Sequence, residues 1–505
     1  MIFSLVLACV ISSSDHTGSA ASTDTKNILQ QPPKPPTINR APTNLAPPPH
    51  QAHGTIPKDL VAVEPSWIEL PVVRKQKKSI IMISLDTVQA KRLSLYGGRA
   101  QVPNITEFAN KSVVFQQAIS HFPQTPHSHW SVMTGVLPEV HGDVPTNRGS
   151  IYSGPTIAET AKRYGYTTGA FISGYSLTKA VTGLHRGFDT YDEDYPFDKV
   201  DNRPGTDITK RALAWLEEAQ KTDTPFFLFV HYFDAHHPYV PKNNIYDRGY
   251  TGKVDGTDDT ILEYREGRAI PSKRDVEHVL ALYDAEITEL DNTIADLLNN
   301  IPKDTVVVLF GDHGESFSHN YYFSHQDGLW DELLHVPLVV YSPDIQKAKE
   351  IPNLVGLYDI APTVLDLAGL PKDKRMQGKS LLGLIDPKLW TSPTPLPTIE
   401  EDRRIYSITN QWNTQRRFSV RTKEWKIINS PRGTERYNIL QDPMELNNLS
   451  NTTIDLLAER NRYNDMIISL RAYQSQSINN QPLDHRECRQ LEKLGYTTCA
   501  TGDIK

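Results

Sequence analysis

Cysteine is almost absent from this chain, which has three in 505 residues, at Cys9, Cys488 and Cys499. The whole middle of the chain therefore offers no thiol nucleophile. Cys488 and Cys499 enclose a short loop, and a disulfide between them would fit an oxidising compartment such as a periplasm or a cell surface. Two free thiols are the alternative, and chemical labelling with and without reductant distinguishes the two.

Positive charge is also scarce. The chain has 53 Lys and Arg against 60 Asp and Glu, a net charge of -7 with neutral histidine. A protein that binds the phosphate backbone of nucleic acid usually shows a basic patch or stripe. The acidic balance argues against nucleic acid as the main partner.

The apolar run at the N-terminus is too short to span a bilayer as a helix. Residues 1–9, MIFSLVLAC, instead resemble a bacterial lipoprotein signal peptide, in which the cysteine after Leu-Ala is lipidated and everything before it is removed. The usual positive start is missing, so an incomplete start or a chance apolar N-terminus is the alternative. We expect a lipid anchor at Cys9 and a location in the bacterial periplasm or at the cell surface.

Phe, Trp and Tyr are missing from residues 12–57, which are rich in Ser, Thr, Gln and Pro. Such a segment cannot bury enough apolar surface to offset the entropy of the chain. We therefore expect residues 10–70 to form a disordered, partly polyproline tether that holds a folded domain away from a membrane.

Buried strands and helices alternate along the next part of the chain. Nearly continuous apolar runs, typical of strands buried on both faces, occur at residues 80–85, 226–232 and 305–310. Helical patterns lie between them, at residues 156–164, 207–219 and 275–299. The alternation predicts an α/β domain over residues 71–397, with a largely parallel central sheet flanked by helices.

The chain changes character after residue 397. Short strand-like pieces at residues 417–420, 425–428 and 436–439 precede a helical pattern at residues 453–473. We expect residues 398–505 to hold a small C-terminal antiparallel α+β subdomain and a tail. The charged, turn-rich insert at residues 242–274 is expected to be a surface excursion near the ligand-binding edge of the main sheet.

Acidic residues and a histidine follow two of the predicted strands. Asp86 follows the strand at residues 80–85, and Asp312 and His313 follow the strand at residues 305–310. Ligands of parallel sheets bind outside the carboxyl ends of the strands. Two carboxylates and an imidazole form a mixed oxygen and nitrogen set that suits a divalent cation, so we expect a metal site here.

Four separated motifs carry a resemblance to the sulfatase family, part of the alkaline phosphatase superfamily. They are SLDTVQAKRLSLYG from Ser84, TPHSHWSVMTG from Thr125, GDHGESFSH from Gly311, and LLHVPLVV from Leu333 with the YDIAPTVLDLAGL that follows it. A further segment, YNILQDPMELNNL from Tyr437, resembles the C-terminal motif of that family. The resemblance runs nearly continuously from residue 79 to residue 449. It implies an alkaline-phosphatase-like fold, a hydrolase that acts on ester bonds, and an anionic ester substrate that is a small molecule or is linked to a glycan.

The nucleophile position departs from the family. Counting back from Thr134-Gly135, the residue that is Cys or Ser in ordinary sulfatases is Thr125 here. Sulfatases oxidise that Cys or Ser to formylglycine, and threonine cannot give this aldehyde by the same route. We therefore expect no formylglycine. His129 replaces the Arg of the motif, and we count it among the candidate catalytic residues.

The local spacing around Thr125 resembles the nucleotide pyrophosphatase/phosphodiesterase branch, in which threonine is the nucleophile. A threonine alkoxide can attack phosphorus or sulfur, and release then requires water to attack the covalent intermediate. We favour a phosphate diester or phosphonate ester as the substrate. A sulfatase that uses Thr125 and a non-catalytic binding domain with a sulfatase fold are the alternatives.

The resemblance also assigns the remaining site residues. Asp86, Thr125, Asp312 and His313 occupy the metal-binding positions, for a divalent ion that could be Ca, Mn, Mg or Zn. His236 and His325 fall where the family places residues near the transferred and leaving groups, and either could instead be a structural histidine. One metal is expected, and a second would use a set such as Asp234, His236 or His237, and His325.

Further departures weaken the case for an ordinary sulfatase. Thr87 stands where the second Asp of the family is expected and Gln89 where an Arg is expected, and residues 169–173 lack the usual Lys and His. The histidines His141, His319 and His335 also lie in motif regions. We expect these three to make structural hydrogen bonds.

Overall fold

The computed structural model describes residues 68–69, 77–142, 152–194, 202–391, 395–411, 415–431, 433–449 and 456–471. The signal and anchor expected at residues 1–9, most of the expected tether, and Cys488 and Cys499 lie outside the described residues. Among the described helices, none is both long and apolar enough to cross a membrane.

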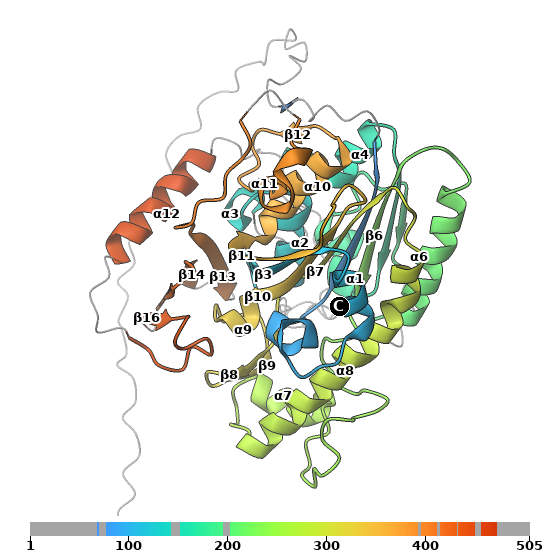
Figure 1. Ribbon diagram of the computed structural model, residues 1–505. Coiled ribbons are helices and arrows are strands. Elements are labelled where there is room, and N and C mark those ends of the chain that lie inside the picture. The colour runs from blue at the N-terminus through green and yellow to red at the C-terminus, as the bar shows by residue number, and fades with distance from the viewer. Residues whose placement is uncertain are drawn as a thin grey trace, which may run out of the picture. The chain divides into compact units, whose positions relative to one another are not determined.

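A central sheet of eight strands forms the core of the domain (Figure 1). Every strand of this sheet runs in one direction except β10, which is antiparallel to both of its neighbours. In spatial order the strands are β11 (Lys349–Gly356), β3 (Val113–Ile119), β10 (His335–Tyr341), β7 (Thr305–Gly311), β2 (Ser79–Leu85), β6 (Phe226–Tyr232), β4 (Thr167–Ile172) and β5 (Thr190–Asp192). The prediction of a largely parallel sheet is confirmed.

Alternating side chains of the central strands enter two separate hydrophobic layers. In β2, Ile80 and Met82 pack on one side, and Ile81 and Ile83 pack on the other. Because successive side chains of a strand point to opposite faces, a continuous apolar run is what a sheet covered on both faces requires. Helices cover the first face with α2 (Thr125–Thr134), α4 (Ile157–Arg163), α10 (Ile360–Ala368) and α11 (Leu382–Ile385), and the second with α1 (Pro103–Ala109), α6 (Gly205–Ala219) and α8 (Lys273–Asn299) (Figure 1).

The C-terminal region is a four-stranded antiparallel sheet with a helix beside it. Its elements are β13 (Ile405–Gln411), β14 (Gln415–Arg421), β15 (Trp425–Ser430), β16 (Gly433–Asn438) and α12 (Leu456–Arg471). Phe418 of this sheet stacks on Tyr463 of α12, with ring centroids 5.5 Å apart. Ile428 joins a second apolar cluster with Leu333 of α9 (Asp331–Leu334) in the main domain. The predicted C-terminal antiparallel subdomain is confirmed.

The insert at residues 242–274 is not irregular throughout, because it contains the helix α7 (Asp258–Arg265). Several contacts tie the insert to α8; for example, Arg274 pairs with Asp247, with Nη1 and Oδ2 2.6 Å apart, and Tyr250 Oη donates to Asp275. Other short elements are α3 (Pro138–His141), α5 (Lys179–Thr182), the hairpin β8 (Ser316–Ser318) and β9 (Tyr321–Ser324), and the pair β1 (Ile68–Glu69) and β12 (Lys372–Asp373).

Candidate active site

The sheet brings Asp86 and Asp312 together at one edge. Asp86 follows β2 and Asp312 follows β7, and these strands are adjacent and parallel. β3 runs in the same direction as β2, so the segment after it reaches the same edge and begins α2 with Thr125. All three residues are fully buried, as is His313. The topology therefore delivers four sequence-predicted site residues to one place.

The carboxylates of Asp86 and Asp312 each keep one oxygen without a hydrogen bond. Among the described residues, neither Asp86 Oδ1 nor Asp312 Oδ2 has a hydrogen-bond partner. Ligand atoms of Asp86, Asp312 and His313 all lie within 4.8 Å of one another. Buried carboxylate oxygens need a cation or a donor, and two carboxylates with an imidazole suit a divalent ion. The donor set fits a metal ion.

The pKa shifts of these three residues also favour a bound cation. Burial raises the pKa of Asp86 to about 7, against the smaller effect of His313. Burial and then the charge of Asp86 raise the pKa of Asp312. Burial lowers the pKa of His313, but the charges of Asp312 and Asp86 together outweigh burial and raise it overall. Two buried carboxylates thus repel each other, and a cation between them would remove that cost.

Thr125 is the first residue of α2, and its hydroxyl faces the carboxylates. Its Oγ1 lies 3.1 Å from Asp86 Oδ2 and 3.2 Å from His313 Nε2. Helix N-termini favour anions because the dipoles of the peptide units add and the first N–H groups lack helical partners. The hydroxyl therefore lies beside the candidate metal ligands and at the anion-attracting end of a ten-residue helix.

Thr87 connects the end of β2 to the end of β7 through a hydrogen bond from its backbone N–H. Its backbone is left-handed, with φ of 58°, which is unusual for a β-branched residue and marks strain at functional sites. In this conformation its N–H donates to Asp312 Oδ1 at 3.1 Å, and its carbonyl accepts from Tyr283 Oη. The expected second Asp is thus replaced by a residue that supports the centre through its backbone.

The structure places His129 on the interior side of the centre. Its Nδ1 donates to the carbonyl of Thr125 at 2.7 Å, and its Nε2 lies 2.8 Å from the hydroxyl of Ser84 on β2. Burial lowers the pKa of His129 to about 3, so the ring is neutral. Both ring nitrogens are occupied by the protein. This geometry suits a residue that holds the first turn of α2, and a direct catalytic role for His129 stays a prediction.

His231 is a site residue that the sequence reasoning missed. It lies on β6, fully buried, with Nε2 3.0 Å from Asp86 Oδ2. Burial lowers the pKa of His231 to about 4, so it acts as a neutral donor that orients the carboxylate. The available signal was a histidine inside an otherwise apolar strand, next to Tyr232.

Three further histidines present Nε2 atoms that, among the described residues, have no hydrogen-bond partner. They are His236, His237 and His325, and burial lowers the pKa of each well below its usual value. The Nδ1 atoms are held by oxygen acceptors: the carbonyl of His237 for His236, Asp258 for His237 and Glu315 for His325. This fixes the tautomer and leaves the Nε2 lone pair available.

The three histidines lie next to one another, beginning beside His313. The ring centroids of His313 and His325 lie 4.6 Å apart, and those of His325 and His236 lie 5.0 Å apart. The orienting carboxylates Glu315 and Asp258 were not singled out from the sequence. Asp258 belongs to the insert, where no hydrophobic period marks it.

The other residues considered in the sequence lie elsewhere. Asp234 accepts from the backbone N–H of Gly205 at the start of α6. The histidines expected to be structural all make hydrogen bonds: His141 with Ser131, His319 with Glu332 and His335 with the carbonyl of Gln116. Among the described residues, the group that could hold a metal ion is Asp86, Asp312 and His313, and it includes none of these.

Sequence comparison identifies the family. The profile described as Sulfatase matches residues 78–370, more than half of the chain, and one described as N-sulphoglucosamine sulphohydrolase, C-terminal, matches residues 318–462. The chain belongs to the sulfatase family. The predicted resemblance is confirmed, and hydrolysis of sulfuric or phosphoric esters, the predicted class of reaction, is the chemistry of that family.

Curated relatives are distant and partly cover the chain. Arylsulfatase K of Canis lupus familiaris is 25% identical over 198 residues, which are 35% of this chain and 35% of that protein. The chain thus matches about a third of the length of that relative. The N-acetylglucosamine-6-O-sulfatase of Bacteroides thetaiotaomicron is 23% identical and covers 74% of this chain and 83% of its own length.

Solved structures share the fold. One, in complex with its substrate D-glucosamine-2-N,6-O-disulfate, has a TM-score of 0.60 at 18% identity and covers 79% of this chain and 98% of that chain. The phosphonate monoester hydrolase of Agrobacterium radiobacter has a TM-score of 0.58 at 17% identity and covers 79% of this chain and 96% of that chain. These likenesses confirm the predicted alkaline-phosphatase-like fold.

Proposed function

We propose that this protein is a metal-dependent hydrolase that cleaves a phosphate diester or phosphonate ester with Thr125 as the nucleophile and without formylglycine. One observation carries the proposal: the Thr125 hydroxyl lies 3.1 Å from Asp86 Oδ2 and 3.2 Å from His313 Nε2, within a buried group that fits a cation. No thiol is present in the middle of the chain to offer another nucleophile.

Asp86, Asp312 and His313 would hold the divalent ion, with Thr125 Oγ1 next to them. When bound, such an ion polarises an ester oxygen and lowers the pKa of a neighbouring hydroxyl. The protein residues define the geometry: His231 orients Asp86, Thr87 N–H orients Asp312, and α2 directs its N-terminus to the transferred group.

The reaction would proceed in two displacements. Thr125 Oγ forms a bond to phosphorus, the bond to the leaving oxygen breaks, and the hydroxyl proton leaves to an adjacent acceptor. Water then attacks the phosphoryl threonine, and the bond between phosphorus and Oγ breaks. His325 and His236 are neutral with a free Nε2 lone pair, so they can accept a hydrogen bond from this water and orient it, while burial lowers the pKa of each and disfavours full proton transfer to them. The proton of the water then passes to the released Thr125 Oγ.

A second candidate is a sulfatase that works through Thr125. It is favoured by the relatives, which include the N-acetylglucosamine-6-O-sulfatase and an ulvan-active sulfatase of Formosa agariphila, 24% identical over 408 residues. These names also support a glycan-linked anionic ester as the substrate. The phosphonate monoester hydrolase among the structures supports the first candidate.

The test is a rate panel of aryl sulfate, phosphomonoester, phosphodiester and phosphonate substrates, each with Mg, Mn, Ca and Zn. Thr125→Ala should abolish turnover of the best substrate. Thr134→Ala is the matched control, because it removes a buried hydroxyl from the same helix, where it donates to the carbonyl of Trp130. Turnover of aryl phosphodiester that is equal in Thr125→Ala and wild type would overturn the proposal. A faster sulfate ester would favour the second candidate.

The lipid anchor at Cys9 and the location in the bacterial periplasm or at the cell surface belong to the same proposal, and sequence alone supports them. Metabolic labelling with a radioactive fatty acid should mark the wild type and not Cys9→Ser. Equal labelling of both, or labelling of neither, would contradict the anchor.

A further inference from the structure

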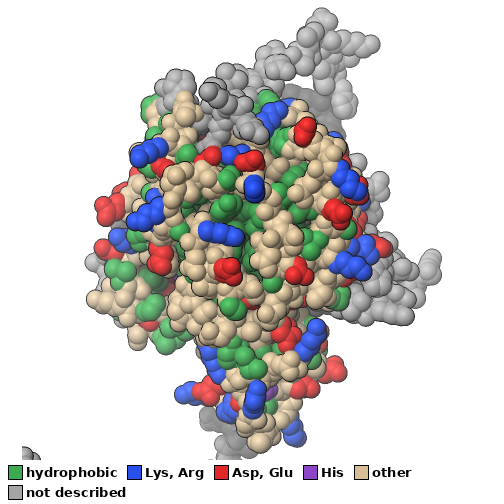
Figure 2. All heavy atoms as spheres, turned by 45° about the vertical axis from the view of Figure 1, so that its right-hand side comes forward, with side chains coloured by type: hydrophobic (Ala, Val, Ile, Leu, Met, Phe, Trp, Pro, Cys, Tyr) green, Lys and Arg blue, Asp and Glu red, His purple; other side chains and the backbone are tan. Residues whose placement is uncertain are grey.

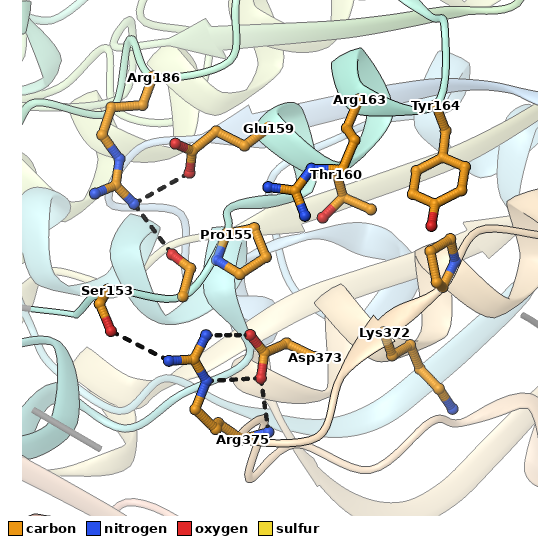
Figure 3. Close-up of a pocket in the computed structure, with 12 residues that line it drawn as sticks. Ser153, Pro155, Glu159, Thr160, Arg163, Tyr164, Arg186, Lys372, Asp373 and Arg375 are labelled. Atoms are coloured by element: carbon orange, nitrogen blue, oxygen red, sulfur yellow. Dashed lines mark hydrogen bonds and ion pairs between the residues drawn. The ribbon is translucent and has the colours of Figure 1, made fainter. Parts of the chain in front are cut away.

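A pocket of about 200 Å³ lies between α4 and β12, away from the candidate active site (Figure 3). Its walls come from three parts of the chain: the segment before α4 together with α4 itself, the loop that carries Arg186, and residues 371–375. Four cationic and two carboxylate side chains line it, namely Arg163, Arg186, Lys372, Arg375, Glu159 and Asp373. A cation-rich pocket is notable in a chain with a net charge of -7.

The Tyr164 end of the pocket lies at the opposite edge of the main sheet from Asp86. The carbonyl of Tyr164 accepts from Lys77, two residues before β2 begins. Asp86 follows the other end of the same seven-residue strand. At ~3.3 Å per residue these two edges are roughly 20 Å apart. None of the residues that line the pocket belongs to the candidate active site.

Arg186 and Arg375 are held in fixed orientations. The Arg186 guanidinium lies 5.0 Å from the ring of Trp130, and the Arg375 guanidinium lies 5.2 Å from the ring of Tyr152. Arg186 also pairs with Glu159 at 3.1 Å. Arg375 pairs with Asp373 and donates to Ser153 Oγ. Stacking and pairing restrict both side chains, so the remaining N–H groups of Arg186 face a defined direction at little further entropic cost.

Arg186 keeps donor capacity within this arrangement. Its Nη2 donates to Glu159 and to the carbonyl of Gly154. Its Nε is buried and, among the described residues, has no hydrogen-bond partner. A buried N–H group without an acceptor is costly, and a bound acceptor would remove that cost.

Arg163 is the uncompensated cation of the pocket. It is the last residue of α4 and is exposed, and in the described part of the chain it pairs with no carboxylate. The neighbouring Lys162 is different, because its Nζ lies 2.6 Å from Asp189 Oδ1. Lys372 likewise contacts Asp366, at 3.1 Å. Figure 3 shows the guanidinium groups of Arg163, Arg186 and Arg375 arranged around Pro155.

We propose that this pocket binds an oxyanion group, a sulfate, phosphate or carboxylate, at a second site separate from the catalytic centre. Planar guanidinium groups match the oxygens of such anions with pairs of donors. The volume is below that of sites for whole drug-sized ligands, roughly 300 Å³ and more, so the pocket fits an anionic substituent with part of a sugar ring. The inference goes beyond the proposed function and does not rest on it.

The experiment compares the wild type with Arg163→Ala and with Lys162→Ala. Both variants remove one positive charge from the exposed side of α4, but only the first removes a pocket donor. Isothermal titration uses inorganic sulfate and, in a second arm, a sulfated disaccharide. Any binding at the catalytic centre is common to all three proteins and cancels in the comparison. Selenate soaked into crystals of the wild type locates the anion by its anomalous signal.

We expect Arg163→Ala to weaken binding by about tenfold or more, and Lys162→Ala to leave it within about twofold. Tighter binding of the disaccharide than of sulfate identifies a glycan-borne group as the ligand, whereas equal affinities identify the free ion. The selenate peak should lie within hydrogen-bond reach of Arg163 or Arg186. An equal loss in both variants, no loss in either, or no selenate peak in the pocket would overturn the proposal.

Discussion

Two buried clusters of charged side chains in this protein differ in whether the carboxylates have cationic side chains as partners. The first is the carboxylate centre of Asp86, Asp312 and His313. The second, the lysine cluster, joins the main domain to the C-terminal sheet. In the lysine cluster Lys426 Nζ lies 2.7 Å from Asp331 and 3.0 Å from Glu445, and Arg421 Nε lies 3.1 Å from Asp331.

The lysine cluster compensates its own charge, whereas the carboxylate centre does not. Lys426 and Arg421 outweigh burial at Asp331 and lower its pKa, whereas at Glu445 burial outweighs Lys426 and raises the pKa to about 7. The lysine cluster nevertheless places two cationic side chains against its two carboxylates. At the carboxylate centre, burial raises the pKa of Asp86 to about 7, and the charge of His313 and the hydrogen bond from Thr125 are too weak to offset it. A buried charge needs a partner. The missing cationic partner at the carboxylate centre supports the proposal that this cluster binds a metal ion.

The largest difference should appear when one carboxylate of the carboxylate centre is neutralised. Asp312→Asn can keep the acceptor for the N–H groups of Thr87 and His313 while it removes the negative charge. We expect hydrolysis to fall by about a thousandfold or more, because the divalent ion loses a ligand. Metal content by mass spectrometry should fall with it.

The metal-free form of this variant gives the control. Without a cation, removal of one of two repelling carboxylates should leave the free energy of unfolding unchanged or raise it. A large loss of stability in the chelated Asp312→Asn protein would contradict the account, since it would make Asp312 a structural residue.

The lysine cluster should respond in the opposite way. Lys426→Met leaves Asp331 and Glu445 buried with a missing partner, so we expect a loss of about 3–5 kcal/mol in the free energy of unfolding. Urea denaturation measures it. Chelator should change this loss little, and activity per folded molecule should stay close to wild type. A loss of stability that depends on added metal would show that the lysine cluster also depends on the metal ion, and would contradict the difference between the two clusters.

A smaller effect should appear in the pH dependence of stability. In chelator, the pKa of Asp86 is raised in the folded protein above its unfolded value, so its contribution is greatest below about pH 4 and is lost as the pH rises towards 7. We expect the free energy of unfolding to fall by about 3 kcal/mol over this range. Bound metal keeps the carboxylate ionised and should remove the slope.

Asp86→Asn should remove about 3 kcal/mol of this fall in chelator. An unchanged fall in this variant would assign the whole effect to other buried groups, such as Glu286, whose pKa burial raises to about 8.

Much of the fold could be predicted because its central strands have an unambiguous pattern. The apolar runs that became β2, β6 and β7 are buried on both faces, and helix α8 shows a regular apolar period. The strands β3 and β10 were not predicted. β3 contains Gln116 and Gln117, which interrupt its apolar run, and the reversed direction of β10 depends on its neighbours rather than on its own sequence.

The candidate site also contains residues that the sequence predicted and residues that it did not. Asp86, Thr125, Asp312 and His313 follow strands or begin a helix, and motif spacing identified them. His231 and Asp258 act through partners distant in the sequence, at Asp86 and His237. No local pattern encodes such a contact, because it exists only once the sheet and the insert have folded.

The most direct test of the central claim is the detection of a covalent intermediate on Thr125. The protein is mixed with an aryl phosphodiester or phosphonate and its best metal, quenched with acid within the first turnover, and digested for tandem mass spectrometry. The account predicts one phosphoryl or phosphonyl group on the Thr125 side chain, absent from Thr125→Ala. Turnover without an adduct in the wild type, together with equal turnover in Thr125→Ala, would contradict it.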